Sequence, residues 1–404
     1  MTTERTSPAM ETPPTTESLP HNVRLLGWAS LLNDIASEAV YPLLPQFLLG
    51  LGSSRALLGL LEGLADTVAS LLKLWTGAWS DRLGQRKIFV VVGYALAGLS
   101  RPCLGLATQI PQVFGIRLLD RIGKGLRTAP RDALITESTV ESQRGYAFGF
   151  HRAMDHLGAA IGPLLAAAFL WFVPDGLRSL MLLTLIPGLI VIGLQVWGLR
   201  ETKRPVIASH RTLKSFPKGP FRLYLISLLV FTFANSSDAF LLVRAGELGV
   251  TTVWLPILWS VLHMAKSLGN RLAGRLADRW SPRMLILLGW GLYATVYLGF
   301  GFATQVWHVW ALFLAYAVFY ALTEPAEKKL VARFAAEGEA GAAFGWFHTV
   351  LGIANLPSSL LFGWLYQSLG PMVAFGWGAF AAFIAAALLT RVGTSKTLLE
   401  AIIL

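Results

Sequence analysis

The sequence predicts an all-α integral membrane protein with twelve transmembrane helices in two pseudo-symmetric six-helix bundles. Of its 404 residues, 54% are hydrophobic and only 14% are charged, which is more apolar surface than one soluble core would hide. The chain contains twelve apolar runs, each close to the roughly 20 residues that cross a hydrocarbon layer of about 30 Å. A charged loop after the second run returns in altered form after the eighth. Together these features indicate a duplicated membrane bundle.

The expected helices follow the apolar runs in order. In the first half they lie near 24–49, 56–79, 88–107, 112–133, 146–170 and 180–199. In the second half they lie near 221–243, 253–276, 284–303, 309–330, 343–366 and 372–389. Pro42 and Pro45 should bend or loosen the outer half of the first helix, because proline breaks the helical hydrogen-bond ladder.

The polar segments set the expected domain boundaries. We expect a disordered cytoplasmic tail over 1–22, bundles over 23–199 and 221–392, a cytoplasmic linker over 200–220 and a cytoplasmic tail over 393–404. Basic residues crowd the linker, whereas the loops of the opposite side offer only Arg55, Arg178 and Arg244. Basic residues in short loops stay on the cytoplasmic side, so both termini should be cytoplasmic. The protein itself is expected in the cell (inner) membrane. The formal charge of +11 is therefore explained by topology, and nucleic-acid binding is not expected.

Residues 77–87 form the repeated loop and read Gly-Ala-Trp-Ser-Asp-Arg-Leu-Gly-Gln-Arg-Lys. The residues of interest in the two copies are Gly77, Asp81, Arg82, Gly84 and Arg86, and then Gly274, Asp278 and Arg279. Both separations are 197 (274 − 77 and 278 − 81). The second copy has Ser281 and Met284 where the first has Gly84 and Lys87. Halves related in this way usually enclose a substrate site near the bilayer midplane.

A loop of the form Gly-x-x-x-Asp-Arg-x-Gly-x-Arg-Lys at this place in both halves resembles the signature of the major facilitator superfamily. The resemblance implies the fold and a transport activity. Arg121-Ile-Gly-Lys-Gly resembles a second signature, Arg-x-x-Gln-Gly, whose arginine is associated with proton coupling; Lys124 replaces the glutamine. The segment Gly158 to Gly162-Pro163 resembles a signature associated with exporters that exchange substrate for protons. An ordinary tight helix crossing, which the glycines also permit, is the alternative.

Ionisable side chains inside the predicted spans are the candidate functional residues. Each costs roughly 2.5 to 3.5 kcal/mol at the centre of a span, so it must be paired or lie in water. In the first half the carboxylates are Asp34, Glu38, Glu62, Asp66, Asp120 and Asp155, and the strong bases are Lys73, Arg101, Arg117, Arg121, Lys124 and Arg152. Helical spacing places Arg117, Asp120, Arg121 and Lys124 on one ridge. We expect these charges to face one shared cavity.

The second half is poorer in charge. Asn235 and Asp238 correspond loosely to Asn33 and Asp34, which favours a site between the first and seventh helices, although Asp238 could equally be a partner of Lys266. For Asp34 and Glu38 a permanent ion pair with the fourth helix is the alternative to a transport role. His263 and His348 have no metal-ligand spacing, so packing is expected for both.

The predicted mechanism is alternating access, in which the halves rock about the cavity. Asp81 should bond to backbone N–H groups at the start of the eleventh helix, near 343–345, where the helix dipole favours an anion. Arg82, Arg86 and Arg127 would bridge the same seam. Asp34, Glu38, Asp66 and Asp238 are the candidate proton carriers.

These features predict a secondary transporter that exports a small organic or amphipathic solute in exchange for protons. A proton-coupled importer of an organic ion or metal chelate, and a non-transporting receptor or scaffold on the same fold, are the alternatives. The sequence offers no nucleotide loop, metal cluster or Ser/His/Asp arrangement, so we expect neither catalysis nor a cofactor. The expected partners are the substrate, protons and the lipid bilayer, and the expected state is a monomer. Cys103, the single cysteine, excludes an internal disulfide.

Overall fold

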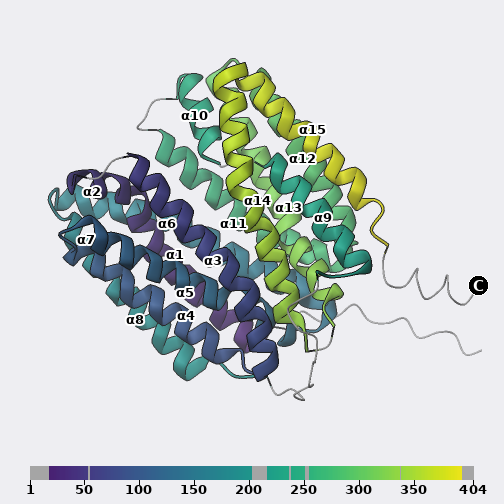
Figure 1. Cartoon of the computed structure of the whole chain (residues 1–404), viewed down its shortest axis with the longest axis horizontal. Helices are drawn as coiled ribbons and strands as arrows, with labels where there is room; N and C mark the ends of the chain where they lie inside the picture. Colours follow the sequence, from purple (N-terminus) through teal and green to yellow (C-terminus); the bar gives the residue numbers. More distant parts are fainter. Residues whose placement is uncertain are drawn as a thin grey trace, which may run out of the picture.

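The structure is a computed structural model that describes residues 18–52, 55–202, 216–235, 238–250, 254–336 and 338–393. Most of the predicted tails and of the predicted linker lie outside these residues. The described part is built from helices, and no strand occurs in it. Figure 1 shows two groups of helices side by side, α1 to α8 and α9 to α15, which we call the first and second halves.

Six spans form the first half. They are α1 (His21–Val40) with η1 (Tyr41–Leu43) and α2 (Leu44–Gly50); α3 (Arg55–Leu83); α4 (Lys87–Ser100) with η2 (Arg101–Leu106); α5 (Ile110–Glu137); η3 (Glu141–Gln143) with α6 (Arg144–Phe172); and α7 (Leu177–Leu183) with α8 (Leu185–Gly193) and η4 (Leu194–Gly198). Pro42 lies in the 3-10 turn η1, so the predicted break in the first helix is present.

Six spans also form the second half. They are α9 (Gly219–Ala234) with α10 (Ala239–Glu247), α11 (Leu255–Arg279), α12 (Pro282–Phe302), α13 (Val306–Phe334), α14 (Ala340–Leu369) and α15 (Pro371–Leu389). The twelve-helix fold in two halves is thus confirmed. One continuous helix over 221–243 was wrong, because α9 ends at Ala234 and a new helix starts at Ala239.

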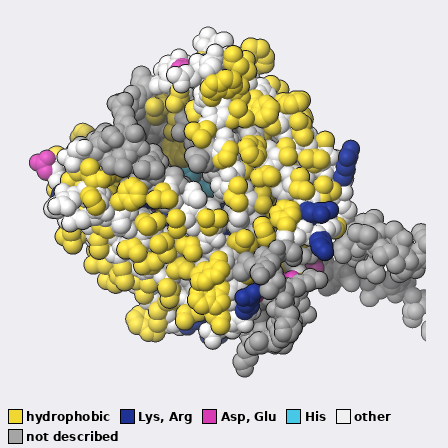
Figure 2. Space-filling view, viewed as in Figure 1, with side chains coloured by type: hydrophobic (Ala, Val, Ile, Leu, Met, Phe, Trp, Pro, Cys, Tyr) yellow, Lys and Arg dark blue, Asp and Glu magenta, His cyan; other side chains and the backbone are white. Residues whose placement is uncertain are grey.

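Within the described residues, seven spans are long and apolar enough to cross a membrane by composition alone: Lys87–Leu106, Glu141–Phe172, Leu177–Gly198, Pro282–Phe302, Val306–Phe334, Ala340–Leu369 and Pro371–Leu389. The other five contain α1, α3, α5, α9 with α10, and α11. Four of these five elements, α1, α3, α5 and α11, carry charged side chains within the helix, and the α9–α10 span is interrupted. The apolar spans that contain α6 and α13 also carry charged side chains, and apolar side chains cover much of the face in Figure 2.

The halves meet along two helix pairs, α6 with α11 and α3 with α14. Glycines make both crossings close. A Cβ on Gly145 would lie 2.7 Å from the Gly274 carbonyl oxygen, and one on Gly77 would clash with the Gly341 carbonyl oxygen. Since Gly274 follows Gly77 by 197 residues and Gly341 follows Gly145 by 196, the two crossings are equivalent by duplication. We call the side where α3 and α11 end, and where α6 and α14 begin, the terminal side.

Candidate functional site

A cavity of about 550 Å³ lies between the halves. Its wall comes from α1, α3, α5 and α6 of the first half and from α9, α11, α13 and α14 of the second. Figure 2 shows a hollow between the halves, far from the C-terminal ends of α3 and α15, with a histidine side chain visible inside. The volume suits a small organic molecule, since ligand pockets commonly enclose about 300 to 1,000 Å³.

Charged side chains from both halves line this cavity. The cations are Lys73, Arg101, Arg117, Arg121, Lys124, Arg127, Arg131, Arg152 and Lys328. The carboxylates are Asp34, Glu38, Asp120, Asp155, Glu324 and Glu327. With histidines neutral, nine cations against six carboxylates give the lining a formal charge of +3 (9 − 6). The first-half charges expected at one cavity line it, except Glu62 and Asp66, whose side chains lie outside the described residues, and the wall is net basic.

The predicted charged ridge runs along α5. Arg117 donates to Asp120 over 3.1 Å, and Asp120 also accepts from Arg101 over 2.9 Å. Arg121 and Lys124 line the cavity beyond this cluster. Asp120 is thus held by two guanidinium groups, which is the arrangement that a buried carboxylate requires.

Two predicted carboxylates on α1 lie at the cavity edge because α1 packs tightly on α6. A Cβ on Gly158 would lie 2.6 Å from the Leu31 carbonyl oxygen, and one on Gly162 would lie 2.7 Å from the Ile35 carbonyl oxygen. This crossing joins α1 and α6, which both belong to the first half. It is compatible with the exporter signature and with an ordinary tight helix crossing. It places Asp34 and Glu38 on the cavity wall, where Asp34 accepts from the Asn33 side chain over 2.8 Å.

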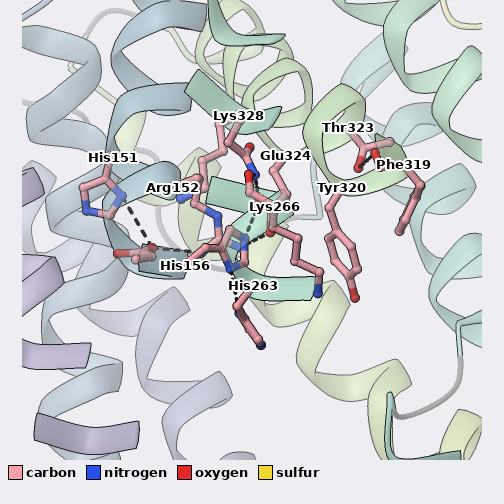
Figure 3. A network of polar contacts seen from close by, with 12 residues as sticks. His151, Arg152, His156, His263, Lys266, Phe319, Tyr320, Thr323, Glu324 and Lys328 are labelled. Atoms are coloured by element: carbon pink, nitrogen blue, oxygen red, sulfur yellow. Dashed lines mark hydrogen bonds and ion pairs between the residues drawn. The ribbon is translucent and has the colours of Figure 1, made fainter. Parts of the chain in front are cut away.

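A polar junction joins α6 of the first half to α11 and α13 of the second (Figure 3). Arg152 donates to Asp155 on its own helix over 3.0 Å and to Glu324 on α13 over 2.7 Å. The other Glu324 oxygen lies 2.9 Å from His156 Nε2 and also accepts from the Asn270 amide over 2.9 Å. His156 Nδ1 lies 3.2 Å from His263 Nδ1. His263, expected to be packing only, is a member of this junction.

Asp238 lies in the break between α9 and α10. Its carboxylate accepts from the Tyr316 hydroxyl over 2.8 Å and lies 3.6 Å from the ammonium of Lys266. That ammonium is 3.4 Å from the Tyr320 ring centroid. Asp238 therefore belongs to a partly buried ion-pair and aromatic cluster, the alternative that the sequence left open, while Asn235 reaches the cavity wall.

A second polar cluster closes the cavity toward the terminal side. Asp132 on α5 is fully buried and accepts from Lys328 on α13 over 2.7 Å. It lies 2.8 Å from His348 Nε2 on α14 and 3.2 Å from Arg131. Lys328 follows Asp132 by 196 residues, so two nearly equivalent positions of the two halves touch each other here. Such mutual contact occurs at the axis that relates the halves.

The repeated loops meet the opposite half on the terminal side. Asp81 accepts from the backbone N–H groups of Gly341 over 3.0 Å and Ala342 over 2.6 Å. Asp278 accepts in the same way from Gly145 and Tyr146, over 2.7 Å each. Each aspartate thus caps the first turn of a helix in the other half, where the dipole favours an anion. The two contacts of Asp81 fall one and two residues before the predicted range 343–345.

The arginines expected at this seam divide into three kinds. The Arg86 guanidinium is buried and donates to Asp81 and Ser80, and to Glu137 over 3.1 Å. Arg82 and Arg279 are exposed. Arg127 does not reach the seam, because its guanidinium lies 4.2 Å from the Tyr94 ring centroid and faces the cavity.

The remaining predicted residues have simple placements. Gly84 follows α3 with a positive φ of 61°, a conformation that favours glycine. Pro163 lies inside α6. Glu62 and Asp66 belong to α3 but lie outside the residues whose side chains the structure describes.

Sequence reasoning missed Arg131, Asp132 and Lys328 as site residues. Arg131 and Asp132 fall inside the predicted fourth helix, but the predicted ridge stopped at Lys124 and was not followed to the end of the helix, which α5 extends to Glu137. The signal was present in the repeat, since Phe148 and Phe344 are also 196 residues apart and their rings meet at 5.7 Å. Applying that separation to charged residues would have paired Asp132 with Lys328.

A polar cavity between two duplicated helical halves defines a membrane transporter of the secondary carrier class. Residues 26–354 and 260–401 match the sequence profile of the Major Facilitator Superfamily, and the chain belongs to this family. An uncharacterised transporter of this type from Methanocaldococcus jannaschii is 31% identical, over 92% of this chain and 94% of its own.

Two further similarities are more distant. A protein of Lactococcus lactis named a multidrug resistance efflux pump PmrA homologue is 26% identical over 65% of this chain and 68% of its own. The crystal structure of the human organic anion transporter MFSD10 superimposes with a TM-score of 0.77 at 16% identity, covering 91% of this chain and 99% of that one. At this sequence identity, the similarity to MFSD10 shows a shared fold.

Proposed function

We propose that the protein is a proton-coupled secondary transporter that exports a small organic solute bearing an acidic group. The observation that carries the proposal is the cavity between the halves, which both halves line and which direct contacts between them close toward the terminal side. Alternating access needs a site that each half can open in turn. In this proposal the terminal side is cytoplasmic, both termini lie there, and the structure represents the state open to the outside.

The charge of the cavity supports the substrate class. Four carboxylates in or beside the cavity wall are held by cations: Asp120, Asp132, Asp155 and Glu324. The lining as a whole keeps an excess of cations. An anionic group would compensate that excess, because a charge in a low-dielectric site must be neutralised by an opposite one. Aromatic side chains such as Phe231, Phe319 and Tyr320 provide an apolar wall for the rest of the solute.

Two observations support export. The segment from Gly158 to Pro163 resembles the exporter signature, and its glycines form the α1 to α6 crossing beside the cavity. The Lactococcus lactis relative is named an efflux pump. Protons would supply the energy, since several carboxylates lie on the wall where their environment changes when the halves move.

Transport by purified protein tests the proposal without knowledge of the substrate. Proteoliposomes are loaded with a bacterial metabolite extract, a pH gradient is imposed, and the released compounds are identified by mass spectrometry. We expect organic acids to leave vesicles containing the wild-type protein. Vesicles with the double variant Asp34→Asn/Glu38→Gln should lose this flux, and those with Asp175→Asn, an exposed loop position, should retain it.

Three results would contradict the proposal. Release that does not respond to the pH gradient would remove the proton coupling. Release that is equal in wild-type protein and the double variant would remove the transport role of the α1 carboxylates, and net uptake under the same gradient would replace export by import.

A further inference from the structure

The junction between α6, α11 and α13 contains a continuous chain of proton-accepting atoms (Figure 3). Glu324 Oε2 lies 2.9 Å from His156 Nε2, and His156 Nδ1 lies 3.2 Å from His263 Nδ1. All three residues line the cavity; His263 is half-buried, whereas His156 and Glu324 are buried. The chain thus leads from a half-buried histidine to a buried carboxylate that belongs to the interface between the halves.

We infer that this chain of Glu324, His156 and His263 is the binding site of the coupling proton, and that its occupancy controls the Arg152–Glu324 bridge between the halves. The inference rests on the proposed proton-coupled transport. It moves the proton site from the carriers predicted by the sequence, which were Asp34, Glu38, Asp66 and Asp238, to the contact between the two halves. Asp34 and Glu38 are then left to face the substrate.

The short contact between two Nδ1 atoms restricts the tautomers. A hydrogen bond there requires a proton on one of the two nitrogens and a lone pair on the other. With Glu324 ionised, His156 Nε2 must carry a hydrogen in order to donate to the carboxylate. In the neutral state His156 Nδ1 is therefore bare, and His263 Nδ1 donates to it. His263 Nε2 is then left as the atom that can accept a proton arriving from the cavity.

Uptake of one proton changes this chain without moving a heavy atom. The arriving proton bonds to His263 Nε2, while the proton on His263 Nδ1 passes to His156 Nδ1. The proton on His156 Nε2 then passes to Glu324, whose carboxyl becomes neutral and donates back to that nitrogen. One proton enters, three N–H or O–H bonds form, two N–H bonds break, and both imidazoles end neutral in their other tautomer.

The electrostatic consequence falls on the bridge between the halves. Arg152 on α6 donates to Glu324 on α13 over 2.7 Å, and a neutral carboxyl attracts the guanidinium far less than a carboxylate does. Arg152 retains Asp155 on its own helix at 3.0 Å, so it is not left without a counter-charge. Protonation therefore weakens a contact between the halves while both sides of that contact stay satisfied. This is what coupling of a proton to rocking requires.

The surroundings of Glu324 contain further charged and titratable groups. They are His151, Arg152, Asp155 and His156 from α6; His263 and Lys266 from α11; Tyr320, Glu327 and Lys328 from α13; Arg131 and Asp132 from α5; and His348 from α14. Asp132 holds Lys328 at 2.7 Å and Asp238 lies 3.6 Å from Lys266. Each of these two lysines thus has its own carboxylate partner, and the groups in direct contact with Glu324 are Arg152, His156 and the neutral amide of Asn270.

A distance measurement between the halves tests the inference without a substrate. In a Cys103→Ser background, spin labels are attached to Gln85→Cys and Ser281→Cys, which are exposed on the terminal side of the first and second halves. Double electron–electron resonance in nanodiscs then gives the distribution of distances between the two labels. From it we obtain the populations with a short and with a long distance, at values from about pH 8 to about pH 5. We expect acidification to raise the ratio of long to short distances roughly 5- to 150-fold, the usual range of coupling between two sites.

Glu324→Gln is the decisive variant because it removes the titrating group and keeps its shape. It should show the long distance at every pH and no response to acid. Infrared difference spectra between the same two pH values should lose one carboxyl band in Glu324→Gln and keep it in Glu247→Gln, an exposed control. If Glu324→Gln does not fold, His156→Gln and His263→Gln replace it, with His308→Gln, in the first turn of α13 and outside the junction, as the histidine control.

A wild-type pH response in Glu324→Gln, or in both His156→Gln and His263→Gln, would overturn the inference. A pH response shifted or lost in the junction variants and kept in His308→Gln would support it. The two proposals fail separately. Gradient-driven transport by wild-type vesicles, together with an unchanged distance response in Glu324→Gln, rejects only this proton site, whereas transport that ignores the gradient rejects the proposed function.

Discussion

Replacement of Asp132 by asparagine should open the terminal side of the protein. The aspartate side chain is fully buried and meets Lys328 at 2.7 Å and His348 at 2.8 Å, both in the second half, as well as Arg131 at 3.2 Å. An asparagine side chain at this position would keep the shape and one acceptor oxygen but lose the charge. Lys328 and Arg131 would then lie close together without their carboxylate.

The magnitude follows from the three contacts. A hydrogen bond to a charged group is worth about 1.5 to 3 kcal/mol and a neutral one about 1 kcal/mol. Losing the charge at three bonds therefore costs about 3 kcal/mol, at the lower end of the roughly 3 to 5 kcal/mol for a broken buried ion pair. Two of the three partners are in the opposite half, so most of this cost falls on the state that is closed on the terminal side. The two bonds to the opposite half account for about 2 kcal/mol, so the ratio of closed to open states should fall by roughly a factor of 30, since about 1.4 kcal/mol corresponds to tenfold.

Thiol labelling measures this ratio. Thr349 is buried, and its hydroxyl donates to the Ser70 carbonyl oxygen across the α3 to α14 crossing over 3.3 Å. In a Cys103→Ser background, Thr349→Cys should react with an impermeant maleimide about tenfold faster or more when Asp132→Asn is present. Asp175→Asn, an exposed change, should leave the rate unchanged. Equal labelling rates in wild-type and Asp132→Asn protein would show that the cluster does not hold the halves together.

Three further substitutions test other parts of the structure. Asp81→Asn should weaken the α14 cap by about 1 kcal/mol and lower vesicle flux several-fold with the protein still in the membrane, whereas unchanged flux would argue against a gating role. Gly149→Ala should lower flux because its Cβ would lie 2.7 Å from Gly274 Cα, while Gly376→Ala, which meets open space, should be neutral in the same assay. Lys266→Met should lower the melting temperature by leaving Asp238 without its cation, and adding Asp238→Asn should restore part of the loss; additive losses would refute that pairing.

The sequence predicted the architecture because the relevant signals are local. Apolar runs, the two loop copies and the helical spacing of Arg117, Asp120 and Arg121 each lie within a few turns of chain. They therefore placed the spans and the ridge of α5. The break at Asn235 to Asp238 escaped because the flanking residues are apolar and contain no proline.

Contacts between the halves were harder to predict because they join positions far apart in the chain. The bridge from Arg152 to Glu324 spans 172 residues, and the two helices that carry it reveal no pairing in their own sequences. Arg127 shows the same difficulty in reverse. It was expected at the seam, but its guanidinium lies over the Tyr94 ring and lines the cavity. Only the repeat separation offers a non-local rule, and it works solely at the symmetry axis.

The two aspartate caps have a consequence for divergence among related carriers. Asp81 and Asp278 bind main-chain N–H groups, so the receiving turns of α14 and α6 need glycine at 341 and 145 for close approach but no particular functional group. Side chains elsewhere on those helices are then free to change as the transported compound changes. Substrate preference can therefore evolve in such a protein while the contacts that hold the two halves together on the terminal side stay the same.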